Sequence, residues 1–236
     1  MIQNPGESIP GVALLTAEAI SVTITKGETM DITKLKEEIR CLFDQDTSGH
    51  DYYHTMRVYQ NAMTIAQQEN CDREVVALGA LLHDADDRKL FSTENYENAR
   101  KLLAFYGASG ELTEKVVSLI ATVSFGGGKT PDTIEGKIVQ DADRLDALGA
   151  IGIARTFAYG GSHSTPMYDP EIPPRENMTP EQYRNHKGTS FNHFYEKLLK
   201  LKDTMHTKKA KELAAHRHAF LETFAQEFLQ EWEGKR

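Results

Sequence analysis

Apolar residues recur every three or four positions along most of the chain from Asp31 onward. In the first such segment, the apolar residues stand at positions 32, 35, 39 and 42, and Asp31 precedes them as an N-cap. This spacing places the four side chains on one face of a helix. The same period predicts further helices over residues 48–69, 72–82, 94–106, 111–123, 133–159, 190–203 and 206–233. We therefore expect an all-α protein.

Capping residues and glycines refine three of these helices. Ser48 and Asp51 form a Ser-x-x-Asp capping pattern before the second helix. Asp72 caps the third helix, whose surface is apolar on nearly every side, as in a buried helix. Gly149 and Gly152 lie inside the segment 133–159, which therefore forms either one helix or two helices separated near these glycines.

Two parts of the chain depart from the helical pattern. Residues 1–29 are interpreted as an N-terminal extension with little fixed structure, in which positions 22–25 are the one short strand candidate. Residues 30–236 are expected to form a single domain. Within it, residues 160–189 are rich in glycine, proline and polar side chains. Irregular segments of that length often serve as lids or binding loops.

Composition and charge narrow the function classes. Hydrophobic residues make up 39% of the 236 residues, which is usual for a folded globular protein. The net charge of −8 argues against nucleic-acid binding, which requires clustered lysine and arginine. Cys41 and Cys71 form no CxxC pair and suit a reducing compartment. No stretch approaches the roughly 20 apolar residues of a membrane helix, so we expect a cytoplasmic protein without membrane or nucleic-acid partners.

Polar side chains stand where the pattern predicts a core. His83 and Asp84 directly follow the most buried helix, and Asp143 lies in a second apolar helix. His54 lies one helical turn after His50. A buried carboxylate needs a cation, a strong hydrogen-bond partner or a proton. One divalent ion would satisfy these groups together, and imidazole with carboxylate ligands suits Mn, Fe, Co, Ni or Zn better than Mg.

Each of these residues also has a structural interpretation when it is taken alone. A single buried histidine is more often a core residue than a metal ligand. Asp143 could pair with Arg57 or with Arg144. Asp84 could cap the turn that follows it. The metal hypothesis therefore depends on the joint occurrence of the four residues.

Four sequence blocks, in a fixed order, carry a more specific pattern. They are residues 50–58 (HDYYHTMRV), 80–84 (ALLHD), 138–147 (IVQDADRLDA) and 189–199 (TSFNHFYEKLL). Together they resemble the HD superfamily of metal-dependent phosphohydrolases, in a bacterial branch with nucleotide pyrophosphohydrolase-like members. The resemblance covers roughly residues 30–232 and implies an all-α HD-domain helical bundle. It also implies that one divalent metal ion is bound by four ligands, namely His54, His83, Asp84 and Asp143.

The resemblance further implies a small phosphorylated substrate, with a nucleotide as the expected class. Asp87 follows Asp84 by three residues, a spacing at which related enzymes use an acid, and it is the candidate proton-transfer group. It could equally pair with the basic residues that follow it at the surface. The candidate phosphate contacts are Lys89, Arg57 and Arg144, in that order.

Further polar residues near these motifs keep more than one interpretation. Asp146 and His50 are candidate partners that orient the metal-binding imidazoles. His193 and Glu196 share one helix face and could be functional or could hold the loop 160–189 in place.

Two other motifs are set aside. Residues 126–130 (GGGKT) end like a phosphate-binding P-loop, but Val123 occupies the position of its first glycine and no strand precedes it. His216 and His218 could suggest a second metal site. Alternate residues on a helix face different directions, however, so we expect a solvated face there.

The sequence leaves two function classes open. The first is a phosphohydrolase, in which pyrophosphate release, monophosphatase and cyclic phosphodiesterase activities are not separated. The second is a sensor or adaptor that contains the metal and binds a nucleotide without turnover. The complete ligand set and Asp87 favour the enzyme. Relatives that hydrolyse ppGpp carry a glutamate soon after the HD pair; residues 85–89 lack it, which argues against that substrate.

Overall fold

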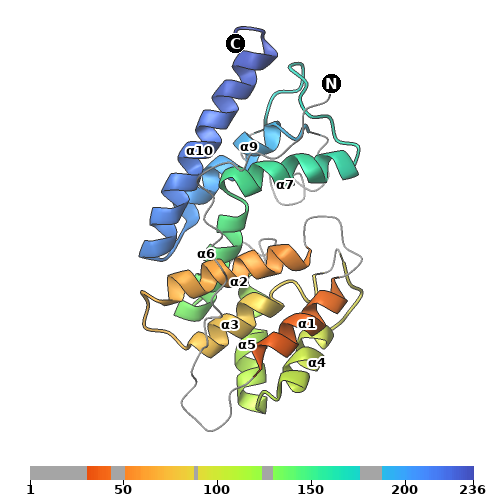
Figure 1. Ribbon diagram of the computed structural model, residues 1–236, viewed down its shortest axis with the longest axis vertical. Coiled ribbons are helices and arrows are strands. Elements are labelled where there is room, and N and C mark those ends of the chain that lie inside the picture. The colour runs from red at the N-terminus through yellow and green to blue at the C-terminus, as the bar shows by residue number, and fades with distance from the viewer. Residues whose placement is uncertain (1–30, 44–50, 88–89, 124–129, 176–187) are drawn as a thin grey trace, which may run out of the picture.

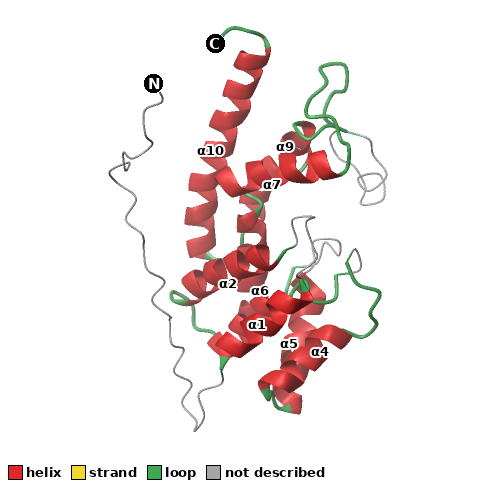
Figure 2. Ribbon diagram, turned by 45° about the vertical axis from the view of Figure 1, so that its right-hand side comes forward, coloured by secondary structure: helices red, strands yellow, loops and turns green. Residues whose placement is uncertain are grey.

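The computed structural model describes residues 31–43, 51–87, 90–123, 130–175 and 188–236. Throughout these residues the secondary structure is helical, without strands (Figure 2), which confirms the all-α prediction. The predicted extension 1–29, with its strand candidate, lies outside the described residues. The extent of the domain, residues 30–236, stays a prediction. Among the described helices, none combines the length and the apolar character that a membrane crossing requires.

The helices follow the predicted order, with two of the predicted segments divided (Figure 1). Their bounds are α1 Ile32–Leu42, α2 Tyr52–Ala66, α3 Arg73–Leu82, α4 Glu97–Tyr106, α5 Gly110–Val123, α6 Ile134–Asp146, α7 Gly149–Ser162, α9 Asn192–Glu196, the 3-10 helix η2 Leu198–Thr204, and α10 Lys208–Trp232. The segment 133–159 thus forms two helices, α6 and α7. The segment 190–203 forms α9 and then the tighter η2.

Side-chain caps set the starts of several helices. Asp31 and Asp72 cap α1 and α3 as predicted, each accepting hydrogen bonds from first-turn N–H groups. The cap of α2 differs from the prediction: Asp51 itself is the N-cap, and its Oδ1 accepts from the backbone N–H of His54 at 2.7 Å. Ser48 lies outside the described residues. The correction matters because the Asp51 cap fixes the backbone at His54.

The break between α6 and α7 falls at Ala147 and Leu148. Leu148 is extended, with φ −110° and ψ 158°, and Gly149 follows with φ +70°, a conformation that favours glycine. A Cβ atom on Gly152 would lie 2.2 Å from the carbonyl oxygen of Ala147. The glycines therefore allow α7 to start tightly against the end of α6.

The first half of the fold, α1 to α6, encloses a mainly aliphatic core. Helix α3 lies at its centre, packs on α2, α5 and α6, and is buried continuously from Val75 to Leu82. This burial explains the all-round apolar surface of its sequence. The polar residues that end α3 are consequently delivered into the middle of the molecule.

The second half, formed by α7, α9, η2 and α10, is held by an aromatic cluster. Helix α10 packs on α7 and η2 and also on α6 (Figure 1). The rings of Phe191 and Phe228 stack at a centroid distance of 4.3 Å, and neighbouring rings meet them edge-on or tilted. The members of the aromatic cluster are Phe157, Tyr168, Phe191, Phe194, Phe224, Phe228 and Trp232.

The segment after α7 is tied to α9. The side-chain amide of Asn192 donates to the carbonyl of Ile172 at 2.7 Å, and Oε1 of Glu196 accepts from the backbone N–H of Arg175 at 3.1 Å. Glu196 thus holds this segment, one of its two predicted roles. His193 is partly buried, and desolvation together with nearby Lys197 lowers its pKa to about 3, so its imidazole is neutral.

The prediction of a solvated face at 216–218 is wrong for two of the three residues. Only His216 is exposed, whereas His218 is buried. The guanidinium of Arg217 donates to the carbonyl of Leu145 at 2.6 Å and to Oδ1 of Asn61 at 3.0 Å. This face of α10 packs on α6 and α2, a tertiary contact that periodicity alone does not reveal.

Candidate metal centre

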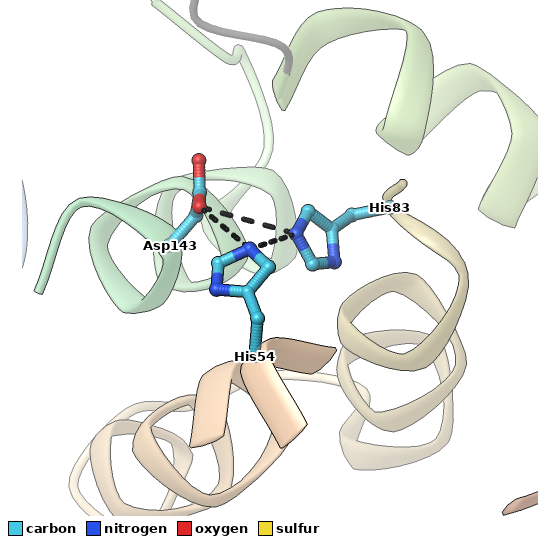
Figure 3. A group of neighbouring side chains, drawn as sticks. All are labelled: His54, His83 and Asp143. Carbon is cyan, nitrogen blue, oxygen red and sulfur yellow. Dashed lines mark hydrogen bonds and ion pairs between the residues drawn. The ribbon is translucent and has the colours of Figure 1, made fainter. Parts of the chain in front are cut away.

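Three separate helices bring the predicted metal ligands together. His54 lies in the first turn of α2, and Asp143 lies near the end of α6. His83 is the C-cap of α3, and Asp84 follows in the turn. Because the helix ends there, these adjacent side chains can both face the same point. Figure 3 shows two imidazoles and the Asp143 carboxylate directed toward one another.

The donor atoms are spaced as ligands of one ion. The Nε2 atoms of His54 and His83 lie 3.3 Å apart, and Oδ1 of Asp143 lies 3.5 Å and 3.9 Å from them, respectively. Oδ2 of Asp84 is 3.4 Å from each Nε2 atom. Ligands at about 2.1 Å from an octahedral ion are separated by about 3 Å when adjacent and about 4.2 Å when opposite. The distances among His54, His83 and Asp143 fall within this range, and their ligand atoms all lie within 4.8 Å of one another. Asp84 lies outside this compact group but within the same range of both imidazoles.

The hydrogen bonds of the two imidazoles decide which nitrogen faces this centre. Nδ1 of His54 is 2.7 Å from Oδ2 of Asp146, and Nδ1 of His83 is 2.9 Å from the carbonyl oxygen of Ala80. Both partners accept hydrogen bonds, so each Nδ1 carries the proton. In the neutral imidazoles both Nε2 lone pairs therefore point at the same place. Two facing lone pairs beside two carboxylates fit a cation.

The electrostatics of the centre also favour positive charge. Burial opposes protonation of His83, but Asp84 and Asp143 outweigh it and raise its pKa to about 9. Burial likewise opposes charge on His54, whose pKa is nevertheless raised by hydrogen bonds to Asp146 and Asp84. In the metal-free protein, a proton on the imidazole supplies the positive charge that the neighbouring carboxylates favour. A divalent cation supplies a greater charge, using the lone pairs that the proton would occupy.

Asp146 links the centre to two arginines. Its carboxylate accepts from Nε and Nη2 of Arg57 at 2.6 Å and 3.0 Å, and from Nη1 of Arg155 at 2.7 Å. Burial acts to raise the pKa of Asp146, but hydrogen bonds from His54 and Arg57 hold it well below its usual range. Asp146 therefore orients His54, as predicted. The pairing of Arg57 with Asp146, and not with Asp143, was not foreseen.

Arg155 was not recognised in the sequence as a residue of this site. It stands on α7, beyond the break that turns the chain, and no motif surrounds it. Only the path of α7 relative to α6 brings its guanidinium to Asp146. The contact could be predicted from the sequence only if the direction of the turn between α6 and α7 were known.

The turn that follows Asp84 is held from α4. The carboxylate of Asp86 accepts from the backbone N–H groups of Asn98 and Ala99 at 3.0 Å and 2.9 Å, in the first turn of α4. The backbone N–H of Asp87 donates to the carbonyl of Asp84 at 3.1 Å. Asp87 thus stays close to a predicted ligand, and its role in proton transfer stays a prediction.

The remaining predicted residues divide into two groups. Arg144 extends to the start of α10, where its Nη1 donates to the carbonyl of Thr204 at 2.6 Å and lies 3.3 Å from Nε2 of His206. This use gives Arg144 a structural role, and its contact with phosphate stays a prediction. Lys89 and His50 lie outside the described residues, as does most of the 126–130 motif.

Comparisons with known proteins agree with this geometry. The sequence model of the HD domain family matches residues 51–148 of this chain, a range that includes all four predicted ligands. The uncharacterized protein YpgQ of Bacillus subtilis is 35% identical over 206 residues, covering 85% of this chain and 93% of YpgQ.

Solved structures extend the likeness to the fold. A Lactobacillus plantarum protein has a TM-score of 0.78 at 37% identity, covering 89% of this chain and all of that one. An HD-superfamily hydrolase of Bacillus thuringiensis has a TM-score of 0.68 at 43% identity, covering 86% and 96%. YpgQ in complex with ADP has a TM-score of 0.66 at 35% identity, covering 83% and 96%. The domain match, the sequence identity to these relatives and the shared fold show that the chain belongs to the HD-domain family.

Proposed function

We propose that this protein is a metal-dependent phosphohydrolase that acts on a nucleotide or another small phosphoester. One observation carries the proposal: the Nε2 atoms of His54 and His83 and the carboxylate of Asp143 converge from three helices, with the carboxylate of Asp84 beside both imidazoles. Four protein ligands leave positions of an octahedral ion for water and a phosphate oxygen. When bound, such an ion supplies Lewis acidity toward the phosphoryl group and makes a water more acidic.

The chain's own residues supply the other parts of the reaction. Asp87 would accept the proton of the attacking water, because its backbone contact with Asp84 keeps it beside the centre. Arg57 is 30% exposed in its side chain, and two of the five N–H donors of its guanidinium bond Asp146. Its positive charge stands beside the centre and would balance charge that develops on phosphoryl oxygens. Lys89 is the further expected phosphate contact.

A nucleotide is the favoured substrate class for two reasons. The sequence resembles a branch with nucleotide pyrophosphohydrolase-like members, and the relative YpgQ has been crystallised with ADP. We infer that this chain binds a nucleoside polyphosphate with its phosphates toward the metal. Release of pyrophosphate from nucleoside triphosphates is the specific reaction proposed.

The test is a nucleotide panel assayed with Mn, Co, Ni and Mg, in which released phosphate and pyrophosphate are measured separately. Pyrophosphate release from a triphosphate in the wild-type protein, and its loss in Asp84→Ala, is the expected result. Exposed His216 offers a matched control, His216→Ala. A stoichiometric ion with nucleotide binding and no turnover across the panel would instead identify a sensor or adaptor.

A further inference from the structure

The Asp146 carboxylate is a junction of side chains from three helices. It is 2% exposed and lies at the end of α6. Its two oxygens receive four hydrogen bonds, from Nδ1 of His54, from Nε and Nη2 of Arg57, and from Nη1 of Arg155. A carboxylate offers about four acceptor sites. Three of the four hydrogen bonds reach Oδ2 and one reaches Oδ1, and together they fix the orientation of the carboxylate.

The two arginines act on this carboxylate from different directions. Arg57 lies three residues after His54 on α2, so its contact is local to the helix that carries the ligand. Arg155 arrives from α7 and bonds Oδ2 at 2.7 Å, the oxygen that also accepts from His54 and, at the longer distance of 3.0 Å, from Nη2 of Arg57. The position of Oδ2 sets the direction of the His54 ring. Arg155 therefore acts at the atom that determines where Nε2 points.

Arg155 is separable from the packing of its own helix. Helix α7 is buried through Gly152, Ile153 and Gly160, and Phe157 joins the aromatic cluster. The side chain of Arg155 is 23% exposed. Ile153 and Phe157 each lie two residues away along the helix, so they project from the opposite face. The apolar packing of α7 therefore depends on these other side chains and not on the guanidinium of Arg155.

We propose that Arg155 is a positioning residue of the metal centre: through Asp146 it holds His54 in the orientation that binds the ion. It thereby joins the helix packed by the aromatic cluster to a ligand set that belongs otherwise to the first half of the fold. This inference rests on the proposed metal-dependent function. Loss of such outer contacts typically lowers metal affinity by about 10–100-fold.

The experiment compares Arg155→Met with Arg155→Lys in the full-length chain. Mn²⁺ affinity is measured by calorimetry, and the His54 imidazole is followed by ¹⁵N NMR in the metal-free protein. We expect Arg155→Met to weaken Mn²⁺ binding about tenfold, toward the lower end of the usual range, and to change the His54 Nδ1–H signal. Arg155→Lys keeps a charged donor and should restore most of the affinity. A purely structural role would give no such rescue.

Arg100 supplies the matched control, since its guanidinium pairs with the exposed carboxylate of Glu114 on α5 and not with Asp146. Arg100→Met should leave both measurements at wild-type values. Wild-type affinity and an unchanged His54 signal in Arg155→Met would overturn this inference while leaving the proposed function intact. Failure of the wild-type protein to bind any of the tested metals would instead refute the proposed function; the NMR comparison still tests the contact from Arg155.

Discussion

The two halves of the molecule differ in what their cores are made of and in what they bring to the metal centre. The first half packs aliphatic side chains around α3 and supplies all four predicted ligands from α2, α3 and α6. The second half packs the aromatic cluster against α10 and reaches the centre through Arg155. The comparison separates the predicted ligands from a residue proposed to position one of them.

This difference has a physical basis in the position of α3. A helix buried on all sides cannot carry charged groups along its length, so the donors stand at its end, where His83 caps it and Asp84 turns away. The close packing around α3 restrains their positions. The chain passes into the second half at the turn Ala147–Leu148, and the approach of Arg155 to the centre depends on how α7 leaves that turn.

The strongest test of the first half is removal of a ligand. His83→Ala takes away one Nε2 donor and leaves Asp84 and Asp143 without their positive neighbour. We expect metal affinity to fall by more than the roughly 100-fold limit of outer-contact changes, with turnover lost. Calorimetry and metal analysis check this, and helical content should remain. Near-normal metal content in this variant would show that the first half does not form the site as described.

Asp87→Asn sharpens the distinction between binding and chemistry within the first half. The amide keeps the size of the side chain but cannot accept a proton as a carboxylate does. We expect turnover to fall by about 100-fold or more, while Mn²⁺ affinity changes little. Steady-state kinetics and calorimetry on one protein preparation measure the two effects. Equal losses in both would place Asp87 among the structural residues.

The pH dependence of metal binding follows from the raised pKa of His83. Burial lowers that pKa, but Asp84 and Asp143 raise it to about 9, so below this pH the bound ion must displace a proton. We expect the apparent affinity to rise about tenfold per pH unit up to about pH 9. Calorimetric titrations from pH 6 to 9 in buffers of different ionisation enthalpy would count the released protons. A flat profile would contradict the proton competition.

The same shift has a consequence for the metal-free fold. A pKa raised from 6.5 to about 9 stabilises the folded state fully below pH 6.5, and this stabilisation is lost as the pH rises through about 9. Denaturant unfolding of the metal-free protein should therefore show a loss of stability between pH 6.5 and about 9. The variant Asp84→Asn separates this effect from the titration of other groups. It removes a charge that raises the pKa of His83, so its loss of stability over the same interval should be smaller.

Phe228→Ala perturbs the second half and should affect the centre least. It removes a ring that stacks on Phe191 and Phe157. Truncation of a buried phenylalanine costs about 3–5 kcal/mol, and partial exposure of Phe228 places the expected loss at the lower end. Because Phe228 contacts none of the predicted ligands and the change reaches the centre through outer contacts such as that of Arg155, Mn²⁺ affinity should fall by no more than about tenfold. A loss as large as that of His83→Ala would remove the distinction between the halves.

Features encoded by neighbouring residues, such as helix caps and helix ends, are predictable from this sequence. Contacts between helices that are distant in the sequence are not. The caps at Asp31 and Asp72 and the position of His83 at the end of a buried helix follow from neighbouring residues. The contacts of Arg144 and His218 depend instead on where α10 packs against α6. Periodicity defines which face of a helix is buried, but it does not identify the helix that covers it.

The four ligands illustrate both sides of this division. Each alone was compatible with an ordinary core role, and the HD-family resemblance grouped them before any geometry was known. The structure then supplied what the resemblance lacks: the Nδ1 partners of His54 and His83, and hence the direction of both lone pairs. Hydrogen-bond partners 92 residues apart in sequence, such as His54 and Asp146, are fixed only by the fold.

X-ray absorption spectroscopy on the Ni²⁺-loaded protein tests most directly whether the four side chains share one ion. The account predicts one ion per chain, with two imidazole nitrogens and carboxylate oxygens at about 2.1 Å and with the imidazole signal reduced in His54→Ala. An ion surrounded by water oxygens alone, or a spectrum that His54→Ala and His83→Ala leave unchanged, would contradict it.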